Sequence, residues 1–365
     1  MTGRLIDLLP WHRIVPLIAL VALVVSWGRD LPMWWLTVLA VLLAGSVLAA
    51  VHHAEVIALR VGEPYGSLVL AVAVTVIEVA LIVTLISTSS KASGSLARDT
   101  VFAALMITCN GIVGAAIVVR TLRGGTARFN AAGAGSGLAA IAALATLSLV
   151  LPTFTTSSAG PTFSTSQLAF AAIAALVVYL LFVFVQTVRH RDYFLPPLVA
   201  GQSASEDSHA DRPSGRVALG SLAMLAVCLV GVVGLAKVTT PLIESIVKGA
   251  GLPVTAVAVV IALLVLLPES IAALRAAHRG RFQTSINLAY GSAMASIGLT
   301  IPTIAVASWL LGFDLMLGLD PVEITMLAIT VGVGILTVTP GRATLLQGGL
   351  HLTLFAGFLV LVVSP

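Results

Sequence analysis

Short clusters of charged, Gly, Pro and Ser residues divide the chain into long apolar runs. A helix needs about 20 apolar residues to cross a bilayer, and most of the runs are of that order. They lack the two-residue alternation of barrel strands, and in lipid only helices and closed barrels satisfy their own backbone. The pattern therefore predicts an all-α integral membrane protein with about eleven transmembrane helices, at residues 14–28, 33–51, 65–88, 100–120, 136–153, 167–187, 216–236, 253–275, 284–311, 321–339 and 342–363.

The composition agrees with a chain whose solvent is mostly lipid. Hydrophobic residues make up 59% of the 365 positions and charged residues 9%, whereas soluble domains average about 25% charged residues. A soluble enzyme, a nucleic-acid-binding protein and a disordered chain are excluded on this ground. No Walker A motif, HExxH or GxSxG occurs, which argues against an ATP-driven pump and the common hydrolases. We expect no cofactor, and the sequence contains no support for an oligomer.

Lysine and arginine alternate between the two sides of the predicted bundle. Fourteen fall on the side of the N-terminus and in every second connection, and five fall on the other side. Cytoplasmic loops retain positive charge, so the N-terminus is predicted in the cytoplasm and the C-terminus outside.

The longest polar connection, residues 189–215, is predicted to be a cytoplasmic linker. It separates a five-helix unit at residues 33–188 from a second at residues 216–365, and residues 1–32 hold one extra N-terminal helix. Because five is odd, a second copy of the same unit enters the membrane upside down. Inverted repeats of this kind are a recurrent transporter plan, with the substrate bound near the midplane.

Two acidic residues cannot easily reach water. Glu78 is in the middle of the third predicted helix, and Glu269 lies within the eighth, which makes each part of the second helix of its half. A charged side chain at the bilayer centre costs about 2.5 to 3.5 kcal/mol. Each could simply be protonated and hydrogen-bonded, but two facing carboxylates can also be neutralised by one divalent cation or by two protons. Competition between these loaded states is the physics of cation/proton antiport.

Other polar residues near the two glutamates fit a hard-cation site. Pro268 frees a backbone carbonyl ahead of Glu269, and such carbonyls and side-chain oxygens are ligands for Ca²⁺ or Na⁺. The next helix of each half holds a polar cluster, which interhelical hydrogen bonding would also explain. With Glu78 and Glu269 as the metal ligands, the candidate cation- and proton-binding residues are Thr75, Asn110, Asn287, Ser292 and Ser296.

Four further residues are candidates for pH sensing or proton relay. His52, His53 and Glu55 cluster at the cytoplasmic end of the second predicted helix, and His351 lies inside the last one. Histidine titrates in the physiological range. A solvated helix-end cluster and a neutral, hydrogen-bonded histidine are the alternative interpretations.

Several stretches resemble the bacterial calcium/proton antiporters of the calcium/cation antiporter superfamily. They are His53-Ala54-Glu55-Val56, residues 62–66 (Gly-Glu-Pro-Tyr-Gly), Thr75-Val76-Ile77-Glu78-Val79, Ala97-Arg98-Asp99-Thr100, Asn110-Gly111-Ile112-Val113-Gly114, Pro268-Glu269-Ser270-Ile271-Ala272-Ala273-Leu274-Arg275 and Gly291-Ser292. The resemblance implies an eleven-helix fold with the first helix outside the two repeats, a bacterial inner-membrane location, and Glu78 and Glu269 as cation and proton carriers. The superfamily's Gly-Asn pair before each glutamate is missing here, where Thr75 and Leu266-Leu267 stand instead.

The function predicted from the sequence is therefore export of Ca²⁺, with Na⁺ or K⁺ as further substrates, in exchange for H⁺ by alternating access. A monovalent Na⁺(K⁺)/H⁺ antiporter with the same site is the main alternative, because members of the superfamily that share this pattern also accept those ions. A cation channel or an intramembrane enzyme is a further alternative, and proton-coupled flux distinguishes the antiporter from both.

Overall fold

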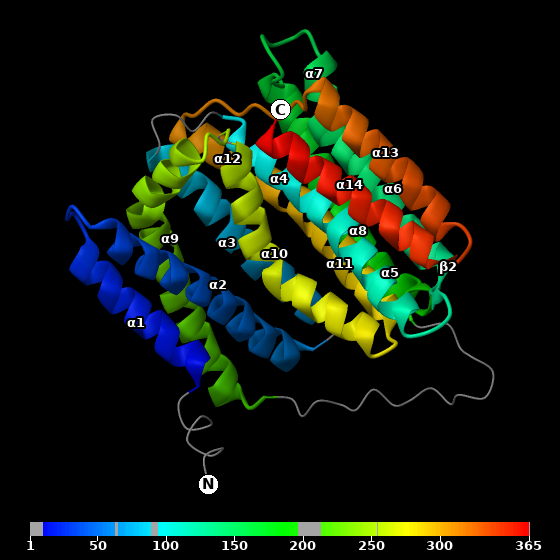
Figure 1. Cartoon of the computed structure of the whole chain (residues 1–365), viewed down its shortest axis with the longest axis horizontal. Helices are drawn as coiled ribbons and strands as arrows, with labels where there is room; N and C mark the ends of the chain where they lie inside the picture. Colours follow the sequence, from blue (N-terminus) through cyan, green and yellow to red (C-terminus); the bar gives the residue numbers. More distant parts are fainter. Residues whose placement is uncertain (1–9, 63–64, 89–93, 196–212, 254, 365) are drawn as a thin grey trace. The chain divides into compact units, whose positions relative to one another are not determined.

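The computed structural model describes residues 10–62, 65–88, 94–195, 213–253 and 255–364, and nearly all of them are helical (Figure 1). Ten helical segments of this described part are long and apolar enough to cross a membrane, and a shorter apolar helix precedes them. The elements are α1 (Trp11–Ser26), α2 (Met33–Val61), α3 (Tyr65–Thr88), α4 (Leu96–Met106), η1 (Ile107–Ile112), α5 (Val113–Leu122), β1 (Ala127–Arg128), α6 (Ala131–Ala145), η2 (Thr146–Val150), α7 (Leu151–Phe154), α8 (Thr165–Phe184), η3 (Val185–Arg189), η4 (Arg191–Phe194), α9 (Gly215–Gly249), α10 (Thr255–His278), α11 (Phe282–Gly298), α12 (Thr300–Leu311), α13 (Pro321–Val338), β2 (Arg342–Ala343) and α14 (Leu345–Val363).

The predicted all-α membrane fold is confirmed, and its eleven apolar runs coincide with eleven helical segments. The predicted run 284–311 is broken at Leu299, where α11 ends and α12 begins. Pro302 lacks the N–H that would bond the carbonyl of Gly298, so the helical ladder cannot continue unbroken there. Residues 238–249 continue α9 without forming a separate helix.

Local sequence signals set several helix starts and ends. Capping boxes begin α8 at Ser164, α13 at Asp320 and α14 at Thr344, each with Gln or Glu three residues later. Gly312, with φ of 70°, ends α12 in the left-handed conformation that favours glycine. These caps satisfy backbone groups at helix ends that have no partner within the helix.

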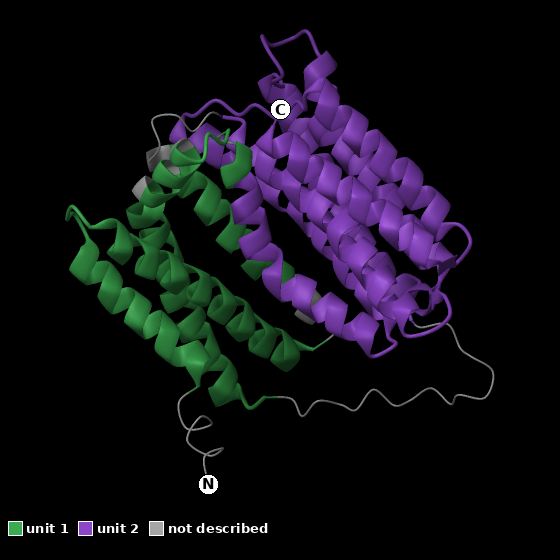
Figure 2. Cartoon of the chain, in the orientation of Figure 1, with its two compact units in different colours: residues 1–93, 208–257 green, residues 94–207, 258–365 purple. Residues whose placement is uncertain are grey.

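The chain forms two compact units (Figure 2). Unit 1 holds residues 1–93 and 208–257, with helices α1, α2, α3 and α9, and unit 2 holds residues 94–207 and 258–365. Each unit thus combines segments from both sides of the predicted linker, most of which lies outside the described residues. The inverted repeats at residues 33–188 and 216–365 divide the chain differently and stay a prediction.

In unit 1, α2 packs against α1, α3 and α9. Small residues allow the close approach: a Cβ added to Gly45 would lie 2.6 Å from Val15 Cγ1, and one added to Gly234 would meet the side chain of Leu23. One face of α2 is buried, with Leu39 and Val47 at 0% exposure. Side-chain packing therefore determines the arrangement of these four helices.

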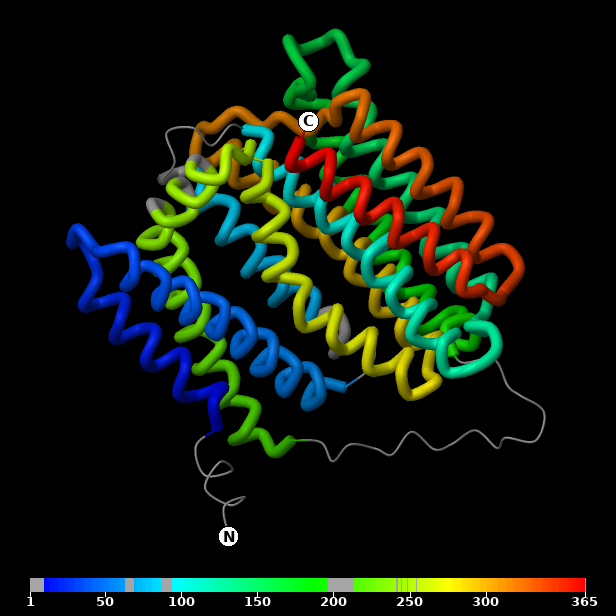
Figure 3. Tube along the Cα trace, in the orientation of Figure 1, coloured from blue at the N-terminus to red at the C-terminus, as the bar shows by residue number. Residues whose placement is uncertain are grey.

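In unit 2, α5 and η1 pack against α14, and α11 packs against α6 and α8. The segment after α5 and the segment before α14 lie side by side at one end of the unit, where β1 pairs antiparallel with β2 and Ala127 faces Ala343 (Figure 3). Cys109 and Cys228 are free and buried.

Candidate functional site

Glu78 lies on α3 of unit 1, in the interior of an apolar helix. Its side chain is 3% exposed, and Thr75, one helical turn earlier, is 5% exposed. The neighbouring Ile77 and Ile82 are completely buried. Burial of a carboxyl group among aliphatic side chains strongly favours its neutral or cation-bound form.

Glu269 lies on α10 in unit 2 and is half-buried. Pro268 precedes it inside the helix and cannot donate a backbone hydrogen bond to the carbonyl of Leu264. Ser270 uses its hydroxyl within the same helix, donating to the carbonyl oxygen of Leu266 at 2.7 Å. Pro268, directly before Glu269 in the chain, therefore leaves one backbone carbonyl of α10 without its usual helical donor.

Asn110 occupies η1, a six-residue π-helical segment that joins α4 to α5. Its side chain is completely buried. Nδ2 donates to Thr330 Oγ1 of α13 at 2.8 Å, and Oδ1 lies 3.0 Å from Nδ1 of His351 on α14. π-Helical turns often occur at functional sites, because the extra residue changes where side chains point.

His351 and its partners continue this network through unit 2. The ring is 1% exposed, and Nε2 lies 3.1 Å from Thr337 Oγ1 on α13. Of the candidates for proton relay, His351 therefore contacts a candidate cation-binding residue directly. The buried, hydrogen-bonded ring also agrees with the alternative interpretation, and the relay role stays a prediction.

The candidate residues on α11 divide into two groups. Ser292 and Ser296 are four residues apart and share one face of the helix, and Ser296 is 6% exposed. Asn287, in contrast, braces the fold: its Nδ2 donates to the carbonyl of Phe194 at 2.7 Å, and its Oδ1 accepts from Gln283 Nε2 at 2.9 Å. Cation binding by these three residues stays a prediction.

The histidines predicted at the end of α2 belong to a larger cluster in unit 1. The ring centroids of His12 and His52 are 4.2 Å apart, and those of His12 and His53 are 5.3 Å apart. His53 Nε2 lies 3.0 Å from the carbonyl oxygen of His12. Glu55 is exposed. The structure thus joins His52 and His53 to His12, and the pH-sensing role of this cluster stays a prediction.

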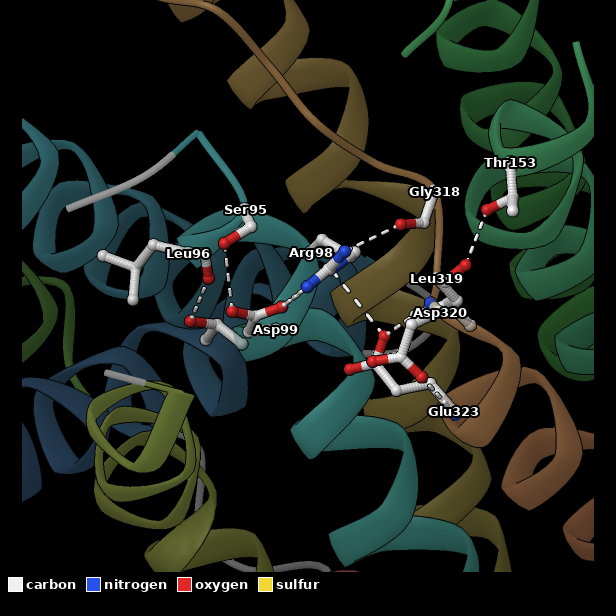
Figure 4. A network of polar contacts seen from close by, with 10 residues as sticks. Ser95, Leu96, Arg98, Asp99, Thr153, Gly318, Leu319, Asp320 and Glu323 are labelled. Carbon is white, nitrogen blue, oxygen red and sulfur yellow. Dashed lines mark hydrogen bonds and ion pairs between the residues drawn. The ribbon is translucent and has the colours of Figure 1, made fainter. Parts of the chain in front are cut away.

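An ion-pair network connects the start of α4 to the start of α13 (Figure 4). Arg98 pairs with Asp99 at 2.7 Å and with Glu323 at 3.8 Å, and its Nη1 donates to the carbonyl oxygen of Gly318 at 2.8 Å. Glu323 in turn accepts from the N–H of Asp320 at 3.0 Å in the capping box of α13. Arg98 thus neutralises acidic charge at this end of unit 2 and anchors the segment before α13.

Sequence reasoning missed three residues of these clusters: His12, Thr330 and Thr337. The two threonines are seven residues apart, which places them on one face of α13, and this spacing could have indicated a polar stripe within an apolar helix. Nothing in the local sequence shows that Thr330 meets Asn110, which is 220 residues away, or that Thr337 meets His351, which is 14 residues away. Likewise, only packing of α1 against α2 brings His12 to the histidine pair. Glu63 and Pro64, part of one matched stretch, lie outside the described residues.

The chain is similar to known transport proteins over almost its whole length. It is 44% identical over 358 residues to y4hA of Sinorhizobium fredii, which carries the name of an ionic transporter, with 97% of this chain and 96% of the relative covered. It is 31% identical over 353 residues to the sodium-potassium/proton antiporter ChaA of Escherichia coli, with 96% and 95% covered.

Solved structures show the same fold at low sequence identity. Native YfkE matches with a TM-score of 0.71 and 14% identity, covering 96% of this chain and 99% of that one. The H⁺/Ca²⁺ exchanger CAX matches with a TM-score of 0.66 and 16% identity, covering 96% and 86%. The family described as sodium/calcium exchanger protein matches residues 31–188 and 220–364. The chain therefore belongs to the sodium/calcium exchanger family, within the calcium/cation antiporter superfamily.

Proposed function

We propose that this multi-pass membrane protein exports Ca²⁺ from the bacterial cytoplasm across the inner membrane in exchange for protons. The family is one of secondary transporters. The observation that carries the proposal is Glu78, a carboxyl group only 3% exposed inside an apolar membrane helix, in a chain of this family. Glu269, on the apolar helix α10, is the second proposed carrier. A secondary transporter needs groups that hold either a cation or protons, and carboxylates do both.

The physical basis is the cost of charge in lipid. An ionised carboxylate at the bilayer centre costs about 2.5 to 3.5 kcal/mol, and this cost disappears when the group is protonated or neutralised by a bound cation. Two glutamates carry two negative charges, which match one Ca²⁺ or two protons. The loaded states are therefore neutral and can reorient, whereas the empty state carries two negative charges and bears their desolvation cost in lipid. This difference couples cation export to proton entry.

A second candidate function is Na⁺ or K⁺ exchange for protons by the same residues. It is favoured by the 31% identity to the sodium-potassium/proton antiporter ChaA, which extends over 96% of this chain. Oxygen ligands serve Na⁺ as well as Ca²⁺. We propose the N-terminus in the cytoplasm and the C-terminus outside for either substrate, as the loop charges predict.

The test uses inside-out membrane vesicles whose interior is made acidic, and a fluorescent dye follows the internal pH. We expect CaCl₂ to collapse the gradient in vesicles with the wild-type protein, and the order of CaCl₂, NaCl and KCl gives the preferred ion. Glu78→Gln and Glu269→Gln keep the side-chain size but remove the negative charge, so both are expected to abolish the response.

Matched controls come from exposed acidic residues in each unit. Asp30→Asn in unit 1 and Asp192→Asn in unit 2 remove one exposed charge each and are expected to leave exchange unchanged. Full exchange in either glutamate variant would contradict the proposed mechanism. A protein that conducts cations without moving protons would instead be a channel, and absence of any response would favour neither form of antiport.

A further inference from the structure

The contacts around the side-chain oxygen of Asn110 fix which atom donates and which accepts in each hydrogen bond. Asn110 Oδ1 can only accept, so Nδ1 of His351, at 3.0 Å, must donate to it. A neutral imidazole then has Nε2 as its acceptor, and the hydroxyl of Thr337, at 3.1 Å, donates to that atom. These two neighbours thereby fix the tautomer of His351, whose ring also has a hydrogen bond with the backbone of Cys109.

The side-chain nitrogen of Asn110 also has hydrogen-bond partners. One N–H of Asn110 donates to Thr330 Oγ1 at 2.8 Å, and Nδ2 also lies 3.7 Å from Sδ of Met106. The hydroxyl of Thr330 is within 3.7 Å of the same sulfur. Both ends of the amide are therefore held, one by α14 and the other by α13.

The remaining hydrogen-bonding capacity of Asn110 identifies its chemistry. An amide side chain has two N–H donors and two lone pairs on oxygen. Two donors and one lone pair are occupied by the contacts with Met106, Thr330 and His351. Among the described residues, no donor occupies the second lone pair of Oδ1, and the side chain has 0% exposure. An oxygen lone pair is what a hard cation accepts as a ligand.

Close helix packing keeps His351 in register with Asn110. A Cβ on Gly114 would lie 2.9 Å from His351 Cβ, and one on Gly348 would lie 2.9 Å from Val118 Cγ2. The absence of side chains at these two glycines lets α5 and α14 approach closely. As a result, the imidazole has little freedom to leave Asn110.

We propose that His351 and Thr330 are positioning residues for Asn110: they hold its amide so that the oxygen, and not the nitrogen, is offered to the transported cation. This inference rests on the proposed function and deepens it, because it assigns a role to two residues outside the glutamate pair. Partners that orient a ligand in this way change metal affinity or activity by about 10- to 100-fold when they are removed.

Two substitutions of His351 separate positioning from mere packing. Asparagine at this position keeps an N–H donor near the place of Nδ1, whereas glutamine keeps an amide near the place of Nε2 and loses the donor to Asn110. Thr330→Val removes the acceptor of the Asn110 N–H. Thr325→Val is the matched control on the same helix, because that exposed hydroxyl only donates to the carbonyl oxygen of Pro321 at 2.7 Å.

The measurement is cation-dependent proton efflux from inside-out vesicles, with apparent KM and maximal rate determined for Ca²⁺ and Na⁺. We expect His351→Gln and Thr330→Val to raise the KM of the transported ion about 10- to 100-fold with a smaller effect on the maximal rate. His351→Asn is expected to stay close to wild type, and Thr325→Val to equal it.

Other results would overturn the proposal. Equal increases of KM in the Asn and Gln variants would show that the donor at Nδ1 is not what matters. A loss of maximal rate or thermal stability with unchanged KM would show a purely structural role. If His351→Gln does not fold, Thr330→Val decides by the same criterion.

The proposed function and this inference fail in distinguishable ways. No cation-driven proton efflux by the wild-type protein would refute both. Efflux that is abolished by Glu269→Gln but has a normal KM in Asn110→Ala would leave antiport intact and refute the positioning of Asn110 as a ligand. A rise in thermal stability with CaCl₂ or NaCl gives a binding readout that needs no transport, and its loss in His351→Gln but not in His351→Asn is the expected result.

Discussion

Gly114→Ala is the sharpest test of how closely α5 and α14 must pack. The added Cβ would lie 2.9 Å from His351 Cβ, 3.0 Å from the backbone nitrogen of Leu352 and 3.1 Å from the carbonyl oxygen of Gly348. Carbon atoms prefer separations of about 3.5 to 4.0 Å, so α14 has to move away by roughly 0.6 to 1.1 Å. Two of the three atoms belong to the backbone, and rotation of a side chain therefore cannot relieve the clash.

The cost is obtained by comparison with Gly349→Ala on α14. A Cβ at Gly349 meets nothing within 4 Å, so this control gains the same helix propensity without a clash. The difference between the two variants is the overpacking cost, about 1 to 3 kcal/mol. Unfolding in mixed detergent micelles measures it, and equal free energies of unfolding for both variants would refute the packing argument. The same displacement moves His351, so the KM of the transported ion is expected to rise in Gly114→Ala alone.

Three further predictions follow from other parts of the structure. Arg98→Gln leaves Asp99, which is 7% exposed, without its ion-pair partner, and we expect it to lower the free energy of unfolding in micelles by about 3 to 5 kcal/mol. Arg191→Gln, which changes an exposed arginine, is the control and is expected to have no such effect. The Arg98→Gln/Asp99→Asn double variant is expected to recover part of the lost stability, and no recovery would contradict the ion-pair argument. Pro268→Ala restores a backbone donor inside α10 and is expected to raise thermal stability while slowing exchange, and faster exchange would contradict a role for the freed carbonyl. A C-terminal alkaline phosphatase fusion is expected to be active and a C-terminal green fluorescent protein fusion dark, and the reverse pattern would show that the loop charges misled us about the orientation.

The sequence predicted the membrane helices well because the cost of unpaired backbone groups in lipid leaves few other structures. Glu78 could also be singled out, since a carboxyl group in the middle of an apolar run needs an explanation. The partners of Asn110 and His351 could not, because threonine is common in membrane helices as a donor to its own backbone, as Thr108 shows with its 2.7 Å bond to the carbonyl of Ala104. Which threonine turns toward a neighbouring helix depends on crossing geometry, and periodicity does not encode it. The hydrogen bonds of Asn287 to Gln283 and Phe194 could not be predicted from the sequence for the same reason.

Unit 1 combines helices that are far apart in the chain, and this has a consequence for biosynthesis. Helix α2 packs against α9, yet about 150 residues separate the end of α2 at Val61 from the start of α9 at Gly215. At about 5 to 20 residues per second, a ribosome needs roughly 8 to 30 s to deliver α9 after α2 has emerged. During that interval the face of α2 that will meet α9, including small residues suited to close packing, is available to other helices or to insertion factors in the membrane. Slowing translation between these two helices should therefore lengthen the lifetime of an incomplete unit 1 and expose it to proteolysis, while unit 2 also waits for its own late segments.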